Sequence, residues 1–250
     1  MVNKTSIHKK ATLVIGASSA IAQATIEQLL ASDHRVIALS RQSLPQVLLP
    51  YLATDNFEWH QTEYHEAAIH RVSATLTENE VFEQIFICNG VLHGADFMPE
   101  KKVEAIAQIS LQQVFDANTL TPLLWLQALI PALENYQQPC YITILSARIG
   151  SISDNALGGW YSYRMSKAAL NMAVKTLAIE CSRRAKQLKF ILFHPGTTDT
   201  PLSKPFQRNV RPDKLFTPAF VALQLLTAKH QVAFDGQASY LDWQHKTIPW

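Results

Sequence analysis

The sequence predicts an α/β protein with a doubly wound, predominantly parallel sheet of about seven strands and helices on both faces. Short apolar runs rich in β-branched residues alternate with amphipathic segments, a pattern typical of βαβ units. The runs read as buried on both faces, as strands of a parallel sheet are. They also end at glycine, at Pro-Gly or at polar residues, which are signals that stop a strand.

The predicted strands are short apolar segments with β-branched or aromatic side chains. They cover residues 11–17, 35–40, 56–60, 84–90, 140–147, 188–194 and 238–242. The first contains a turn glycine, Gly16, near its end, and the sixth is followed by Pro195 and Gly196. The segment 56–60 has the weakest strand pattern of the set.

Helices are predicted between the strands because apolar residues recur there at helical spacing. They cover 19–32, 65–77, 111–134, 160–184 and 218–228, the third interrupted at Pro122. Residues 41–55 contain two prolines and predict a loop with a short helix. Without a repeat or linker, the pattern predicts one domain over residues 1–250, with an irregular segment at about 201–216 that covers the substrate. Right-handed crossovers make this the Rossmann arrangement, with ligands at the carboxyl ends of the strands.

Composition excludes several classes of function. The hydrophobic fraction of 48%, the charged fraction of 17% and a net charge of +2 describe a soluble globular protein without a nucleic-acid or membrane partner. No apolar stretch reaches the roughly 18 residues of a membrane-spanning helix, and no apolar leader is found. The early basic residues are interpreted as a solvated lead-in to the first strand: Lys4, His8, Lys9 and Lys10.

Three scattered cysteines, Cys88, Cys140 and Cys181, lack metal-ligand spacing. Cys88 and Cys140 fall in apolar strand-like runs, so they are interpreted as reduced core residues of a cytoplasmic protein. No metal site is predicted.

The first strand is followed by the segment GASSAIA. Gly16 supplies a tight turn, while Ala20 and Ala22 stand where a dinucleotide fingerprint carries further glycines. Ser18 and Ser19 lie at the start of the predicted helix, where hydroxyls cap the helix or bind phosphate. The alternative is an ordinary strand-to-helix turn with a serine cap.

The second strand ends in Ser40-Arg41. An acid at this point would bind the ribose hydroxyls of NAD and repel a 2′-phosphate, whereas an arginine attracts that phosphate. Together with the preceding motif, Arg41 predicts NADP(H). Taken alone, Arg41 is more typical of a solvated surface residue.

Tyr163 and Lys167 are four residues apart in the predicted helix 160–184, so they share one face of it, and Tyr161 points elsewhere. An ammonium near a phenol stabilises the phenolate, which suits the pair to general acid–base catalysis. A chance pairing on the surface is the alternative.

Several motifs occur along the chain in one order: GASSAIA, the break at CNG, Asn118 inside a long helix, YSYRMSK and HPGTTDT. In this order and over essentially its whole length the chain resembles the short-chain dehydrogenase/reductase family. The segments SARIGSISDNALGGWYSYRMSKAALN and YLDWQHKTIPW are similar to the branch named after the bacterial C-factor cell–cell signalling protein, which also includes carbonyl reductases.

The resemblance implies hydride transfer between NADP(H) and a small-molecule carbonyl or secondary alcohol. It implies that Tyr163 is the general acid in reduction, that Lys167 supports it and binds the nicotinamide ribose, and that Asn118 anchors a water leading from the lysine. A local helix irregularity is the alternative for Asn118. The resemblance assigns cofactor binding to Gly16, Ser18, Ser19, Ile21, Arg41, Asn89, Gly90, Tyr163, Lys167, Pro195, Gly196, Thr198 and Thr200.

The sequence also departs from the family. The usual catalytic serine falls on Ala147, so Ser146 is assigned to the role, with Ser151, Ser153 or a water as alternatives. Ser146 lies one residue early and should point to the other side of the strand. The acid expected after the third strand is replaced near Thr62 or Glu63. A dinucleotide-binding regulatory or signalling protein with vestigial catalysis therefore remains the alternative function.

A homodimer or homotetramer is predicted because helices 111–134 and 160–184 carry more apolar positions than one sheet face can cover. The positions concerned are Leu123, Trp125, Leu126, Leu170, Met172, Val174 and Leu177.

Overall fold

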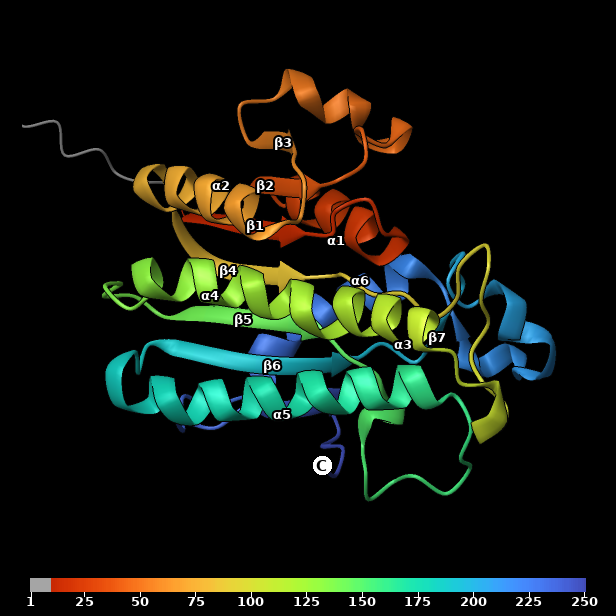
Figure 1. Cartoon of the computed structure of the whole chain (residues 1–250). Coiled ribbons are helices and arrows are strands. Elements are labelled where there is room, and N and C mark those ends of the chain that lie inside the picture. The colour runs from red at the N-terminus through yellow and green to blue at the C-terminus, as the bar shows by residue number, and fades with distance from the viewer. Residues whose placement is uncertain (1–9) are drawn as a thin grey trace, which may run out of the picture.

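The computed structural model describes residues 10–250, so Lys4, His8 and Lys9 of the basic lead-in lie outside the described residues. Its centre is a seven-stranded sheet in the order β3-β2-β1-β4-β5-β6-β9, in which every neighbouring pair is parallel (Figure 1). The strands are β1 (Lys10–Ile15), β2 (Arg35–Ser40), β3 (Phe57–Gln61), β4 (Val81–Ile87), β5 (Cys140–Leu145), β6 (Leu188–His194) and β9 (Ser239–Asp242). The predicted doubly wound sheet is confirmed.

The order of the strands reverses between β1 and β4. From β1 the chain runs outward through β2 and β3, and it then returns to the other side of β1 to begin β4. Loops that leave β1 and β4 therefore diverge, which opens a crevice at the carboxyl ends of these two strands.

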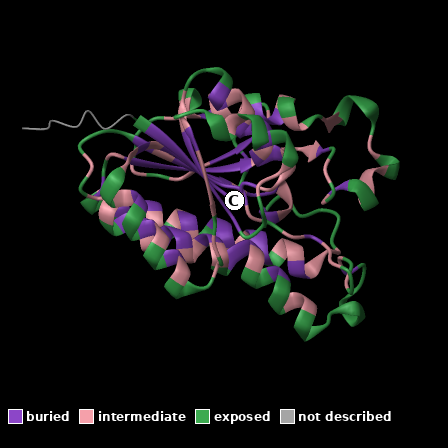
Figure 2. Ribbon diagram, turned by 90° about the horizontal axis from the view of Figure 1, so that it is seen from above, coloured by how far each residue is buried: buried purple, intermediate pink, exposed green. Residues whose placement is uncertain are grey.

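Helices cover both faces of the sheet (Figure 1). They are α1 (Ala20–Ala31), α2 (Glu66–Asn79), α3 (Gln108–Phe115), α4 (Thr121–Leu133), α5 (Tyr161–Arg184) and α6 (Pro218–Thr227). One core cluster joins α2, α4 and α5 to alternate strand residues such as Leu13 and Ile15, and the other joins α1 and α6 to residues such as Val14. Figure 2 shows the buried strands between helices whose outer sides are exposed. The sheet is apolar on both faces because both faces are covered.

The predicted long helix 111–134 is divided in the structure. Between α3 and α4 the backbone forms a π-helical turn, Asp116–Leu120, and Pro122 lies in the first turn of α4. A proline is tolerated there because the π-turn just before it already interrupts the regular hydrogen-bond pattern of the helix. π-turns inside helices are frequent at functional sites, and this one contains Asn118.

The segment 201–216 is irregular, as predicted. It holds two short 3₁₀ helices, Lys204–Asn209 and Pro212–Lys214, and the strand β8 (Leu215–Phe216), which pairs with β7 (Thr197–Thr198) beyond the end of β6. A further 3₁₀ helix, Gln46–Ala53, is the short helix expected within 41–55.

Most of the residues from which an oligomer was predicted are buried within the subunit, so they offer no contact surface. Trp125, Leu126, Leu170 and Val174 are at most 1% exposed, because α4 and α5 pack on the sheet and on neighbouring helices at once. Met172 is 63% exposed. Besides Met172, four exposed apolar side chains outside the predicted set lie on α3, on the π-turn and on α5: Ile109, Phe115, Leu120 and Met165.

Candidate functional site

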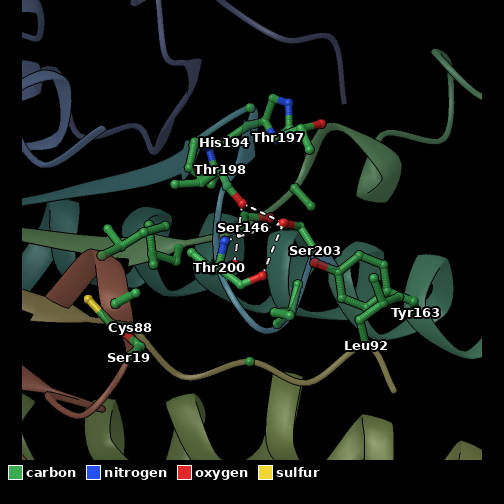
Figure 3. A pocket seen from close by; sticks show the side chains of 18 of the residues that line it. Ser19, Cys88, Leu92, Ser146, Tyr163, His194, Thr197, Thr198, Thr200 and Ser203 are labelled. Carbon is green, nitrogen blue, oxygen red and sulfur yellow. Dashed lines mark hydrogen bonds between the residues drawn. The ribbon is translucent and has the colours of Figure 1, made fainter. Parts of the chain in front are cut away.

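A cavity of about 530 Å³ opens at the carboxyl ends of the central strands. Its walls come from the loops after β1, β4, β5 and β6, from the start of α5 and from the segment 201–216. In Figure 3, Ser19 and Cys88 lie at one end of this cavity and Tyr163 and Leu92 at the other, with Thr200 and Ser203 between them. It brings together most of the sequence-predicted site residues: Ser18, Ser19, Ile21, Asn89, Gly90, Ser146, Tyr163, Lys167, Pro195, Gly196, Thr198 and Thr200. Gly16, Arg41 and Asn118 do not belong to its lining.

The turn after β1 depends on Gly16. Its φ of +75° is left-handed, and a Cβ there would lie 3.0 Å from the backbone of Cys88 and of Asn89. Only glycine therefore lets the β1 turn approach the end of β4 so closely. The hydroxyl oxygen of Ser19 then accepts the backbone N–H of Ala22 at 3.3 Å and caps α1. The first turn of α1 contains no acidic residue, so its N-terminus can accept an anion.

The end of β2 is joined to this turn by Tyr64, which the sequence analysis missed. The Tyr64 hydroxyl accepts the N–H of Gly16 and donates to the carbonyl of Leu39, both at 3.0 Å. The guanidinium of Arg41 lies 5.5 Å from the centre of the Tyr64 ring, within cation–π range. Arg41 is exposed and adjoins the turn without lining the cavity.

Tyr163 and Lys167 lie on the first turns of α5 and both line the cavity. Lys167 is 2% exposed, and its ammonium donates to the carbonyl of Leu145 at 2.9 Å. Burial lowers the pKa of Lys167 from 10.5 to about 8 and raises the pKa of the Tyr163 phenol above its ordinary value of 10. Desolvation disfavours the charged form of each group, so the phenol is protonated near neutral pH and can act as a proton donor.

Asn118 holds the loop after β4 against α5. Its side-chain oxygen accepts the N–H of Val91 at 2.7 Å, and its amide donates to the Val91 carbonyl at 2.8 Å and to the Ser166 hydroxyl at 3.0 Å. A Cβ at Gly90 would lie 3.5 Å from the Asn118 oxygen and 3.7 Å from the Lys167 nitrogen. Asn118 therefore sits in a helix irregularity and lies near Lys167, while its role in anchoring a water stays a prediction.

None of the three candidate serines has a free hydroxyl at the cavity. The buried Ser146 hydroxyl donates to the side-chain oxygen of Asn171 at 2.6 Å, although the residue touches the cavity. The Ser151 hydroxyl accepts the N–H of Asp154, and that of Ser153 donates to the carbonyl of Trp250. Ala147 lines the cavity and offers no hydrogen-bond donor from its side chain.

The loop after β6 supplies polar groups that lack protein partners. The Thr198 hydroxyl and the Nδ1 of His194 are buried at the cavity without a hydrogen bond, as is the side-chain oxygen of Asn89 across from them. Buried polar atoms are nearly always satisfied, so this set fits a polar ligand. Burial lowers the pKa of His194 to about 4, which keeps its imidazole neutral.

One wall of the cavity is apolar, and the sequence analysis missed it. The side chains come from the loop after β4, the loop after β5, the start of α5 and the segment 201–216: Leu92, Ile149, Trp160, Leu202, Phe206 and Val210. Only Trp160 could have been singled out from the local sequence, because the Gly-Gly pair precedes it.

No carboxylate or guanidinium belongs to the cavity lining within residues 10–250, and no cluster of metal-ligating side chains is found in that part of the chain. None of its helices is long and apolar enough to cross a membrane.

The chain is similar in sequence and in fold to known proteins. The model of the short chain dehydrogenase family matches residues 10–211. C-signal of Myxococcus xanthus is 32% identical over 142 residues, 56% of this chain and 78% of the relative. The 1-hydroxy-2-glutathionyl-2-methyl-3-butene dehydrogenase of Rhodococcus sp. (strain AD45) is 29% identical over 159 residues, 62% of this chain and 68% of the relative. The NADPH-bound carbonyl reductase from chicken fatty liver has the same fold, with a TM-score of 0.81, 22% identity and coverage of 98% of this chain and 100% of that structure.

Proposed function

Because the chain belongs to the short-chain dehydrogenase family, we propose that it is an NADP(H)-dependent oxidoreductase acting on a carbonyl compound or a secondary alcohol. One observation carries the proposal. The half-buried Tyr163 and the buried Lys167, one helical turn apart, face the same cavity, and desolvation displaces the pKa of each. Perturbed titratable groups in a cleft are typical of catalytic sites.

The residues present fit a dinucleotide. The N-terminus of α1 offers N–H groups to its phosphates, and Asn89 and Thr198 carry buried polar atoms without partners at the cavity. When bound, NADPH supplies the hydride. Lys167, Thr198 and Thr200 would hold its nicotinamide half, and Ser18, Ser19 and Ile21 its phosphates.

Arg41 supports a preference for NADP(H). It is an exposed cation adjoining the Gly16 turn, and Ser40 stands where an acid would repel a 2′-phosphate. Several neighbours of the same fold were solved with NADP or NADPH, including a carbonyl reductase from Pseudomonas aeruginosa.

In the proposed reduction, Tyr163 donates its phenolic proton to the substrate oxygen, and Lys167 stabilises the phenolate that results. The phenol is protonated at neutral pH, which is the form that reduction requires. Alcohol oxidation needs the phenolate, and its rate should therefore rise with pH.

The test is NADPH oxidation by the purified protein with a panel of aldehydes and ketones, for the native chain and for Tyr163→Phe. We expect activity to fall about 10²–10⁴-fold in the variant, the contribution of general acid catalysis, with NADPH affinity nearly unchanged. Tyr161→Phe is the matched control, since Tyr161 does not line the cavity. Equal activity in the native chain and Tyr163→Phe would exclude the assigned role.

A dinucleotide-binding signalling protein with vestigial catalysis is the second candidate. It is favoured by Ala147 at the usual serine position, by the engaged Ser146 hydroxyl and by the similarity to C-signal. NADPH binding without turnover of any carbonyl compound would support this candidate.

Association into a homodimer or homotetramer is also proposed. The exposed apolar side chains of α3, the π-turn and α5, including Met165 and Met172, form a face typical of subunit contacts. The three cysteines are buried and free, which supports the proposed cytoplasmic location.

A further inference from the structure

The turn before α5 is held in a conformation that is unfavourable for its last residue. Gly158, Gly159 and Trp160 have φ values of 65°, 65° and 54°. Two glycines adopt the left-handed region freely, but a side chain with a Cβ does so at a cost in free energy. Such strain persists only where surrounding contacts enforce it, and it is concentrated at functional sites.

The contacts that enforce this turn are on both of its sides. Arg164 donates to the carbonyls of Gly159 at 2.9 Å and Gly158 at 3.0 Å. The buried carboxylate of Glu100 accepts the N–H of Ser162 at 3.1 Å and also its hydroxyl, while the Glu100 carbonyl accepts the N–H of Trp160. These contacts fix the backbone from which the Trp160 indole projects.

The indole of Trp160 lies between the proton donor and the segment 201–216. Its ring centroid is 6.4 Å from that of Tyr163, in a T-shaped arrangement, and 4.9 Å from that of Phe206. The Phe206 ring also packs near His93, with 5.8 Å between the two ring centroids. Trp160 and Phe206 both line the cavity, so a substrate that presents its carbonyl to Tyr163 places its substituent against this aromatic wall.

The aromatic wall of Trp160 and Phe206 has a larger part in orienting the substrate here than it would in a site with a catalytic serine. Ala147 gives the substrate oxygen no second donor, and the Ser146 hydroxyl is engaged by Asn171. With one side-chain donor assigned to the carbonyl, packing of the substituent contributes a larger share of the orientation. Apart from Lys167, which is assigned to the phenol and the ribose, the lining within residues 10–250 contains no guanidinium, ammonium or carboxylate, which favours an uncharged substituent.

We infer that Trp160, supported by Phe206, is the specificity-determining residue of this site and that it selects carbonyl substrates bearing a planar, uncharged aromatic substituent. The inference rests on the proposed reductase function. Neither residue donates a proton; they position the substrate by stacking, in which offset and edge-on ring contacts are favoured.

The experiment compares matched pairs of substrates that differ in planarity: acetophenone against cyclohexyl methyl ketone, and benzaldehyde against cyclohexanecarbaldehyde. The ratio of kcat/KM for the aromatic member to that for the saturated member is measured with NADPH for each variant. Because intrinsic reactivity is the same in every variant, only the change in this ratio reports on the wall.

Trp160→Leu should lower the ratio roughly 2–10-fold, the range that an aromatic pair contributes, and Trp160→Phe should retain most of it. Phe206→Leu should lower the ratio in the same direction, and it decides the matter if Trp160→Leu does not fold. Tyr161→Leu, next to Trp160 on α5 and outside the cavity lining, should leave the ratio unchanged. NADPH affinity should be unaffected in all four.

Two failures are distinguishable. If the native chain reduces saturated carbonyls as well as aromatic ones, or if both leucine variants keep the native ratio, the inference is wrong and the reductase function stands. If the native chain binds NADPH but reduces no carbonyl compound, the proposed function fails and the inference fails with it.

Discussion

Replacing Lys167 by methionine should stabilise the fold while it removes activity. Burial lowers the pKa of Lys167 from 10.5 to about 8, which corresponds to roughly 3 kcal/mol of destabilisation at pH 7, because each pKa unit is ~1.4 kcal/mol. Methionine keeps much of the apolar stem but leaves the Leu145 carbonyl without its donor, at a cost of about 1–2 kcal/mol. We expect Lys167→Met to raise the free energy of unfolding by about 1–2 kcal/mol at pH 7.

The stability gained by Lys167→Met should decrease as the pH rises. Between pH 8 and 10.5 the unfolded lysine holds its proton and the folded one does not, so the stability of the native chain rises with pH through this window. The advantage of Lys167→Met should therefore be full below pH 8 and shrink towards pH 10.5. Above that range the lost hydrogen bond leaves the variant the less stable of the two.

The assay is urea denaturation followed by tryptophan fluorescence at intervals from pH 7 to pH 10, with NADPH oxidation measured on the same samples. Lys186→Met, at an exposed lysine just beyond α5, controls for the loss of a positive charge. A stability difference that does not change with pH, or a variant less stable than the native chain at pH 7, would refute the reasoning.

The features that could be predicted from the sequence are local in the chain. Strand periodicity, the Gly16 turn and the four-residue spacing of Tyr163 and Lys167 each depend on residues within one or two turns of each other. The doubly wound arrangement followed because right-handed crossovers restrict βαβ units to few arrangements.

The parts that were missed depend on residues distant in sequence. Tyr64 contacts a turn 48 residues earlier, and Glu100 binds the start of α5 from 62 residues away. The apolar wall joins Leu92, Trp160 and Phe206 from three loops. Counting apolar positions also misjudged α5, because Leu170 and Val174 pack into the core beside the sheet and neighbouring helices. A pattern within a short stretch of sequence cannot predict contacts between residues so far apart in the chain.

Three further changes test the remaining assignments. Arg41→Ala should weaken NADPH binding by about 1.5–3 kcal/mol, the scale of a charge-assisted hydrogen bond, and leave NADH binding unchanged; equal NADPH and NADH affinities in the native chain would refute the preference. Met172→Glu should shift the mass measured by light scattering towards the monomer, because a charge would interrupt the exposed apolar face, whereas a native chain already monomeric at micromolar concentration would exclude the oligomer. Ala147→Ser should raise kcat/KM for carbonyl reduction. Position 147 lines the cavity, and the Tyr240 hydroxyl donates to its backbone carbonyl at 2.6 Å. The backbone that would bear the new serine hydroxyl is therefore held in place. Losing one such donor costs other enzymes about 10²–10³-fold, and we expect a gain of roughly tenfold, with Ser146→Ala changing activity little because its hydroxyl serves Asn171. If Ala147→Ser leaves the rate unchanged while Ser146→Ala abolishes it, Ser146 leaves Asn171 during turnover and is itself the second donor.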